Sequence, residues 1–212
     1  MKYRHIIQCL LLLASVHPLA ACAGSLTYSA EPIETKVIDA DTKQPLEGVV
    51  VTANWQLEEG TFGGNVPAGQ LMVMESVTDK EGKFSFPAFG PKRAPKGHLV
   101  NRDPQLLLFK SGYEYQRLNN PYSSDREMRL RPVRRSVWNG RVIALKKFTG
   151  TRTEWFKMLE RSIPELGLPE DAKKISTLLK AILAEEDSIP DSIERKHLFF
   201  DNIVRRLLEE GK

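Results

Sequence analysis

The sequence is poor in the residues that most often bind metals or act as nucleophiles. Its 212 residues include two cysteines, both within the first 22 positions, and four histidines. No Cys/His cluster has the spacing of a zinc site, and neither Gly-x-Ser-x-Gly nor Gly-x-x-x-x-Gly-Lys occurs. We therefore expect no catalytic residue, no metal site and no cofactor, and we expect that the protein is not an enzyme.

Charge of one sign is not in large excess either. Lys and Arg number 31 and Asp and Glu number 27, which gives a formal net charge of +4. This near balance says little about partners, and we expect no nucleic-acid partner. Ten basic residues are concentrated between Arg126 and Lys157, against two glutamates. Such a run is usually a solvated strand face, and contact with lipid phosphate groups is the alternative.

Long apolar runs are absent after residue 21. Within residues 1–21, Lys2 and Arg4 precede an apolar run that is interrupted by Gln8 and by His17-Pro18. The run is too short and too interrupted to span a bilayer by itself. A basic start followed by a short apolar stretch is typical of a signal peptide, so we expect residues 1–21 to be removed.

The end of this segment carries a membrane-anchoring pattern. "LAAC", residues 19–22, resembles the lipobox of bacterial lipoproteins, in which the cysteine is acylated and the chain is cut just before it. The resemblance implies that Cys22 is the lipid attachment site and that membrane lipid is a partner. Because Ala23 rather than Asp follows, it also implies the outer membrane, facing the periplasm. Ordinary secretory cleavage after Ala21-Cys22-Ala23 is the alternative.

Residues 33–150 have the period of β-strands, and the small, polar residues 22–32 are expected to be a tether. In "GVVVTANWQLEE", apolar residues alternate over five positions, which predicts a half-buried strand. About seven short strands with turns between them predict a mainly β fold, an antiparallel Greek-key β-sandwich. The other strand patterns lie near residues 34–39, 71–78, 83–86, 104–110, 113–118, 127–132 and 141–148.

The stretch "VTDKEGKFSF" can be interpreted as a turn or as a metal loop. Asp79 can accept hydrogen bonds from the turn backbone, and Gly82 can adopt a positive φ, with Phe84 and Phe86 on one face of the next strand. A calcium loop needs a bidentate Glu six residues after its glycine, and Ala88 stands there. The pattern therefore favours a hairpin turn.

Three segments in this order resemble the carboxypeptidase regulatory-like domains, which are small transthyretin-like (prealbumin-like) sandwiches. The matching features are the expected hairpin at residues 42–48 before the valine strand, Thr78-Asp79-x-x-Gly82-x-Phe84, and Gly112-Tyr113. The resemblance covers about residues 33–147 and implies a module without catalytic residues of its own. The insert "FGPKRAPKGHLVNRDP", residues 89–104, departs from the shortest members and has no assigned role.

Residues 151–212 have a helical period, and about three helices are expected there. Thr151 with Glu154, and Asp191 with Glu194, form capping boxes. The apolar stripes are expected to pack on one another and on the sandwich, and the alternative is that one stripe docks an envelope protein. The middle stripe comprises Ile175, Leu178, Leu179, Ile182 and Leu183, and the last comprises Phe199, Phe200, Ile203, Val204, Leu207 and Leu208.

These features predict a non-catalytic, lipid-anchored protein of the bacterial cell envelope that acts as an adaptor or assembly module. One alternative is a glycan-binding lipoprotein, which an exposed row of aromatic side chains would support. The other is a periplasmic hydrolase, which would need His98 or His197 beside a carboxylate in a polar cleft. The aromatic candidates are Trp55, Tyr113, Tyr115, Tyr122 and Trp138, although Trp55 falls on the apolar face of its strand.

Overall fold

The computed structural model describes residues 26–100, 102–121, 132–162, 172–187 and 209. These residues form eleven strands, two α-helices and one short 3₁₀ helix, so the expected mainly β class is confirmed. Two of the expected three helices are present. The third, with its Asp191/Glu194 capping box, lies outside the described residues, as do Cys22 and most of the expected strand at 127–132.

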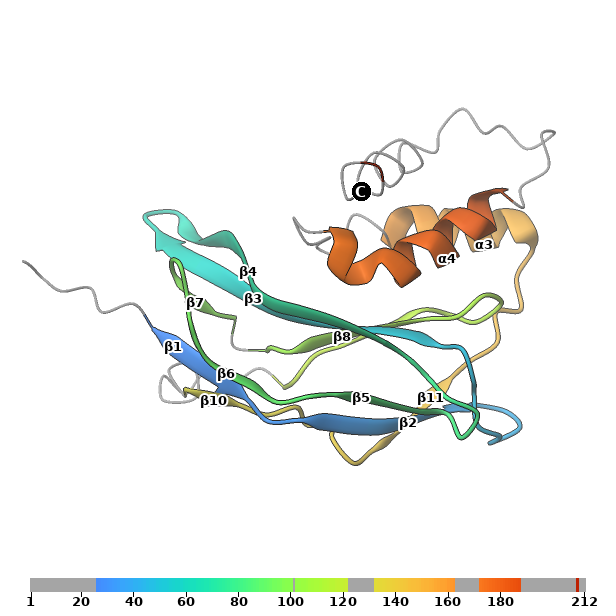
Figure 1. The fold of residues 1–212 in the computed structure, drawn as a ribbon. Helices are drawn as coiled ribbons and strands as arrows, with labels where there is room; N and C mark the ends of the chain where they lie inside the picture. The colour runs from blue at the N-terminus through green and yellow to red at the C-terminus, as the bar shows by residue number, and fades with distance from the viewer. Residues whose placement is uncertain (1–25, 101, 122–131, 163–171, 188–208, 210–212) are drawn as a thin grey trace, which may run out of the picture.

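The strands form three sheets (Figure 1). The largest has the order β4-β3-β8-β9, with β7 also paired to β3, and the smaller two have the orders β10-β1-β6 and β11-β2-β5. The strands are β1 Thr27–Ala30, β2 Ile33–Asp39, β3 Val50–Thr61, β4 Gly64–Val77, β5 Lys83–Phe86, β6 Phe89–Arg93, β7 His98–Leu99, β8 Gln105–Phe109, β9 Gln116–Leu118, β10 Val133–Arg134 and β11 Val142–Leu145; the helices are α3 Arg152–Ser162, η2 Ala172–Ile175 and α4 Ser176–Asp187.

Most strand pairs are antiparallel, as expected, and two are parallel. β10 runs parallel to β1, and β11 runs parallel to β2, each at the edge of a small sheet. Parallel neighbours need a long connection, and both strands follow β1 and β2 by about a hundred residues along the chain. The alternation of apolar residues in the sequence does not distinguish the two directions of pairing.

The first core lies between the large sheet and the two small ones. From β3 and the residue before it, the five alternating apolar residues all enter this core, and Trp55 is 1% exposed. Phe84 and Phe86 on β5 enter it from the opposite side, as their alternation predicts. Burial of these large side chains supplies the main hydrophobic stabilisation of the β domain.

A second core lies on the other face of the large sheet, beneath α3 and α4 (Figure 1). Val50, Val73, Leu107 and Phe109 of the sheet pack against the helices, so β3 is buried on both faces rather than half-buried. All five residues of the predicted middle stripe are buried there. For α3 and α4, the expectation that their stripes pack on the sheet is confirmed.

Local signals account for the start of α3. The backbone N–H of Glu154 donates to Thr151 Oγ1 at 3.3 Å, and the backbone N–H of Thr151 donates to Glu154 Oε2 at 2.7 Å. This confirms the first capping box. Neither α3 nor α4 combines the length and apolar character needed to cross a membrane.

Residues 27–30, expected within the tether, belong to the fold instead. They form β1, which pairs with β6 and β10, and Tyr28 is 1% exposed. The segment is too short for its alternation to be recognised in sequence, and only its neighbours in the sheet stabilise it. The part of the expected tether before the first strand is therefore residues 22–26.

Candidate functional site

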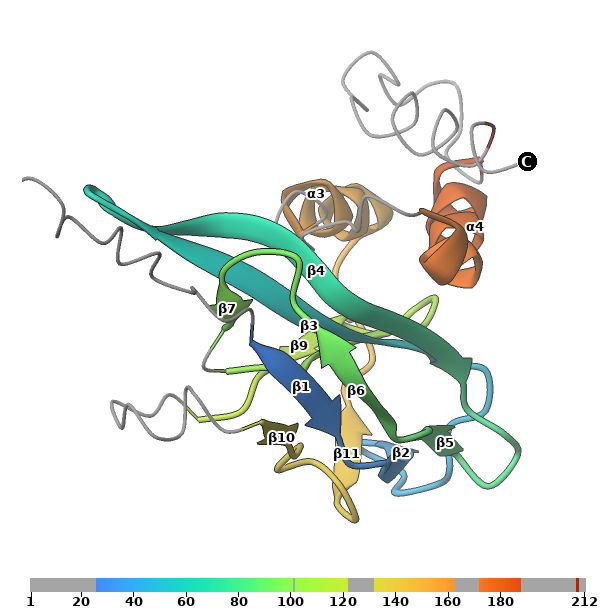
Figure 2. The same cartoon turned by 60° about the vertical axis from the view of Figure 1, so that its left-hand side comes forward.

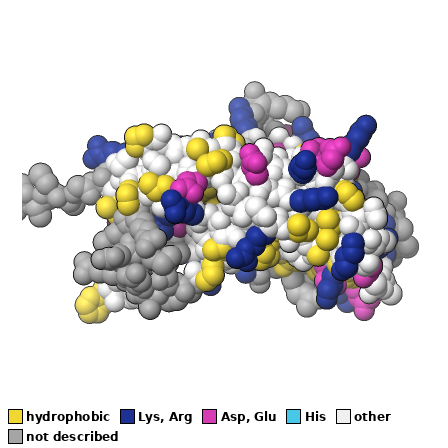
Figure 3. Space-filling view, turned by 90° about the horizontal axis from the view of Figure 1, so that it is seen from below, with side chains coloured by type: hydrophobic (Ala, Val, Ile, Leu, Met, Phe, Trp, Pro, Cys, Tyr) yellow, Lys and Arg dark blue, Asp and Glu magenta, His cyan; other side chains and the backbone are white. Residues whose placement is uncertain are grey.

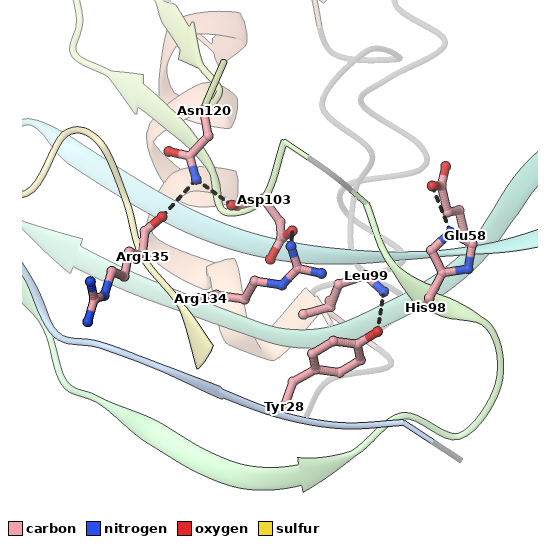
Figure 4. Close-up of polar contacts among 8 residues, drawn as sticks. All are labelled: Tyr28, Glu58, His98, Leu99, Asp103, Asn120, Arg134 and Arg135. Atoms are coloured by element: carbon pink, nitrogen blue, oxygen red, sulfur yellow. Dashed lines mark hydrogen bonds and ion pairs between the residues drawn. The ribbon is translucent and has the colours of Figure 1, made fainter. Parts of the chain in front are cut away.

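A buried ion pair joins the segment before β8 to β10 (Figure 4). Arg134 Nη1 lies 3.4 Å from Asp103 Oδ1, and the side chains are 6% and 1% exposed. The parallel register of β10 on β1, which aligns Arg134 with Ala30, positions the guanidinium inside the molecule. Arg134 was expected on a solvated strand face, and this expectation is wrong.

Burial changes the protonation of this carboxyl group. It raises the pKa of Asp103 to about 7, while the positive charge of Arg134 acts in the opposite direction. Within the described part of the chain, neither carboxyl oxygen of Asp103 has a hydrogen-bond partner. Without such donors the charged form is poorly stabilised, so near neutral pH Asp103 is present in both protonation states.

The groups around this pair are structural in character. The Arg134 guanidinium lies 5.3 Å from the centre of the Tyr28 ring, and the Tyr28 hydroxyl accepts a 3.4 Å hydrogen bond from the backbone of Leu99. Asn120 Nδ2 donates to the carbonyl oxygens of Asp103 and Arg135, at 2.6 and 2.8 Å. These contacts hold β1, β10 and the segments around β7 and β8 together (Figure 4).

A small polar cavity adjoins the ion pair. Its volume is about 170 Å³, enough for a few waters or a small polar molecule. In its wall, Gln105 Nε2 donates to Asn119 Oδ1 at 3.2 Å, and the buried Asn54 Oδ1 has no hydrogen-bond partner among the described groups. The cavity is lined by Asn54, Gln56, Val100, Arg102, Asp103, Gln105, Arg117 and Asn119.

His98 lies beside a carboxylate, as the hydrolase alternative requires. Its Nε2 is 3.1 Å from Glu58 Oε1, and the two residues are directly opposite in the pairing of β7 with β3 (Figure 4). Neither residue lines the polar cavity or the groove described next. The register of the two strands makes the pair a cross-strand contact, with both side chains partly exposed. His197 lies outside the described residues.

A wider groove of about 610 Å³ runs between β4 and the sheet that contains β2 and β5. Its wall mixes the acidic Glu34 and Asp79 with the basic Lys36, Lys83 and Arg141. This mixture indicates no single class of ligand.

The turn after β4 has the local chemistry that the sequence predicts, but the predicted hairpin is wrong: β4 belongs to the large sheet, whereas β5 pairs with β2 in a small sheet, so the turn connects two sheets. Asp79 Oδ1 accepts hydrogen bonds from the backbones of Glu81 and Lys83, at 3.0 and 2.8 Å, and Gly82 has a φ of +73°. In the parts of the chain that the structure describes, no three His, Cys, Asp or Glu residues are grouped as metal ligands would be.

The aromatic candidates that the structure describes do not form one exposed row. Trp55 is core, Tyr113 and Trp138 pack against the first core, and Tyr115 packs against the second, beyond the large sheet. Tyr122 lies outside the described residues. On the face shown in Figure 3, Lys and Arg side chains are spread among acidic and hydrophobic ones rather than gathered in one patch.

The Asp103–Arg134 pair and the adjoining cavity were missed by sequence reasoning. Asp103, Arg102 and Val100 belong to the insert at residues 89–104, to which the sequence assigned no role. A buried carboxylate has no local sequence signature when its partner is about thirty positions away. An acid directly before a proline is typical only of a turn.

No family model and no curated protein sequence matches the chain. Seven chains of solved structures do. One is a 3-chlorocatechol 1,2-dioxygenase from Rhodococcus opacus, at 16% identity and a TM-score of 0.33, matched over 58% of this chain and 62% of that one. Another is a 9R-lipoxygenase from Cyanothece, at 13% identity and a TM-score of 0.27, matched over 76% and 24%. The chain thus spans less than two thirds of either protein, and similarity this low says nothing about function.

Proposed function

We propose that the protein is a lipid-anchored, non-catalytic module of the bacterial cell envelope, acylated at Cys22. The observation that supports this most directly is "LAAC" at the end of a short, interrupted apolar run with a basic start. Acyl chains on Cys22, each stabilised by about 0.8 kcal/mol per buried methylene, would make the attachment effectively permanent. The protein would then act at the membrane surface, in our proposal on the periplasmic side of the outer membrane.

We further propose that the β domain is a transthyretin-like Greek-key sandwich of the carboxypeptidase regulatory-like type. The two small sheets that pack across one core from the large sheet support this proposal. The turn at residues 79–82, with Asp79 and Gly82 in the expected roles, supports it as well. In such a domain the buried Asp103–Arg134 pair has a structural role.

An adaptor or assembly role requires a surface for an envelope protein. The stripes of α3 and α4 are covered by the large sheet, so they do not supply it. We propose that the partner contacts the last expected helix, whose Phe199, Phe200 and Val204 belong to a broad apolar face in the sequence. These residues lie outside the described part of the chain.

The anchor can be tested with the two cysteines of the chain. Cells that express the wild type, Cys22→Ser or Cys9→Ser are grown with radiolabelled palmitate, and the purified proteins are compared. Wild type and Cys9→Ser should be labelled, because Cys9 leaves with the signal peptide, whereas Cys22→Ser should not be. Equal labelling of Cys22→Ser and wild type would exclude acylation at Cys22.

The membrane can be identified in the same cells. Separation of inner and outer membranes on a sucrose gradient should place the labelled wild type with the outer membrane. Its recovery in the inner membrane would contradict that part of the proposal and leave the anchor itself intact.

A further inference from the structure

The connection between β3 and β4 carries a large apolar side chain, Phe62, on the surface. All nine residues 59–67, named the hairpin tip here, are exposed. Phe62 is fully exposed (112%), and Val66 is 43% exposed. The tip, "EGTFGGNVP", contains one charged residue. A large side chain held entirely in water at the end of a hairpin serves no purpose in packing the fold.

The hairpin tip is an ordered extension of the sheet. Its two arms remain paired up to Thr61 and Gly64, and Thr61 Oγ1 donates to the carbonyl oxygen of Gly64 at 2.6 Å. On the outer side of β3, the last paired residue is Glu58, opposite His98. Residues 59–61 continue β3 past this point. With a rise of about 3.3 Å per residue, they place the turn about 10 Å beyond the neighbouring strand β7. The hairpin therefore presents Phe62 on a protruding arm.

This arm lies at the same end of the molecule as the start of β1. The backbone N–H of Ala94 donates to the carbonyl oxygen of Leu26 at 2.8 Å, and three residues later Gly97 packs against the backbone of Glu58. In Figure 1, the first residues of β1 and the turn between β3 and β4 both lie at the left-hand end, and in Figure 2 the turn extends further to the left than β1. The chain thus enters the fold beside the arm.

The short leader between the anchor and β1 limits the distance to the membrane. This step rests on the proposed acylation of Cys22. Thr27 follows Cys22 by five positions, with four residues between them, so even a fully extended chain spans at most about 18 Å. The end of the molecule that holds both Thr27 and the hairpin tip must therefore stay close to the bilayer.

The charges at this end complement a phospholipid surface. Lys92, Arg93 and Lys96 are exposed beside the start of β1, in and just after β6. The tip contributes only the acidic Glu59, and Glu58, just before it, makes the 3.1 Å contact with His98 that is described above. Basic side chains near an exposed aromatic residue are typical of segments that lie at the boundary between lipid head groups and acyl chains.

We propose that the hairpin tip contacts the bilayer that holds the lipid anchor, with Phe62 inserted at the head-group boundary and the three basic residues facing anionic phospholipid head groups. The acyl chains supply the attachment, and the hairpin sets the orientation. With one end fixed on the lipid, the end that holds the turn at residues 79–82 faces away from the membrane. A protein partner on Phe62 is the competing occupant.

The contact can be measured with a single fluorescent probe. In the lipidated protein the Cys22 sulfur is blocked, so Asn65→Cys supplies one reactive thiol within the tip while Phe62 is kept. The labelled full-length protein is reconstituted in vesicles of phosphatidylethanolamine and phosphatidylglycerol with an environment-sensitive dye. The emission should shift to the blue, brominated phospholipid should quench it, and aqueous iodide should lose access. Lys80→Cys, in the exposed turn at the other end of β4, is the matched control and should remain open to iodide.

A second variant tests the role of the aromatic ring. Phe62→Ser in the Asn65→Cys background should largely remove the blue shift and restore quenching by iodide, with an unchanged melting temperature because Phe62 packs against nothing. The contact is overturned if the probes at the tip and at the control position behave alike on vesicles, or if the tip probe is shielded only after other envelope proteins are added.

Palmitate labelling of the same samples reports the anchor separately. An unlabelled wild type would exclude the anchor, and the probe in the tip would still decide the contact. Quenching of the tip probe by brominated lipid would then support the contact between the hairpin tip and the bilayer, and free access of iodide to the probe would overturn that contact.

Discussion

Glu75 on β4 accepts a 2.8 Å hydrogen bond from the backbone N–H of Leu178 in the first turn of α4. Its second carboxylate oxygen accepts another, at 2.9 Å, from the N–H of Thr177. Glu75 therefore caps a helix that begins about a hundred residues later in the chain. The negative charge also lies at the positive end of the helix dipole, where it is stabilising. In the sequence, Glu75 only interrupts the alternation of its strand.

We expect Glu75→Ala to lower the free energy of unfolding by about 1–2 kcal/mol, because two N–H groups of α4 lose their acceptor. Glu75→Gln keeps one side-chain oxygen and should cost less. Denaturation by urea, followed by circular dichroism, would measure both. The control is Glu59→Ala in the exposed hairpin tip. If Glu75→Ala costs no more than this control, the cap does not contribute to stability.

The two glycines Gly82 and Gly112 give a matched test of the turn after β4. Their φ angles are +73° and +75°, so alanine carries the same conformational cost at each, about 1 kcal/mol. A Cβ at Gly112 would meet nothing within 4 Å, whereas at Gly82 it would collide with the carbonyl oxygen of Val37. Gly82→Ala should therefore cost about 3 kcal/mol or more.

The measurement is the difference between the two free energies of unfolding in urea. Similar values for Gly82→Ala and Gly112→Ala would show that the backbone of the turn moves aside easily. In that case the close approach between Gly82 and Val37 does not restrict this position.

Asp103 predicts a pH dependence of stability. Its pKa is raised from 3.8 to about 7 in the folded protein, so between these values the folded state binds more protons than the unfolded state. Stability should therefore fall as the pH rises, by at most about 1.4 kcal/mol per pH unit, and level off above about pH 7. The pKa of Asp39 is lowered to about 2, so its stabilising contribution is already complete above about pH 5.

Asp103→Asn should flatten this dependence between about pH 5 and pH 7, because an amide does not ionise. In the acidic part of the range the variant and the wild type should have similar stability, because the wild-type carboxyl group is mostly protonated there and is neutral like the amide. Urea denaturation at several pH values would show both effects. A wild-type stability that rises across this range would contradict the burial of an ionisable Asp103.

Sequence and structure agree most closely where interactions are local. The alternation from Val49 to Leu57 predicted a strand and identified Trp55 as core. The Asp79–Gly82 turn and the Thr151/Glu154 capping box were predictable because their partners lie within four residues. Period and turn chemistry are properties of a short stretch, so they can be read without knowledge of the fold.

By itself, the sequence therefore determined the β class, the change to helices near residue 150, the apolar stripe of α4 and the expectation of a lipid anchor at Cys22. Only the tertiary structure decided that α3 and α4 cover the second face of β3, that Glu75 caps α4, and that Asp103 and Arg134 meet in the interior. It also decided that the hairpin tip lies at the end of the molecule where the chain enters the fold. These contacts join segments about thirty to more than a hundred residues apart, and no local pattern encodes them because they exist only once the sheets have assembled.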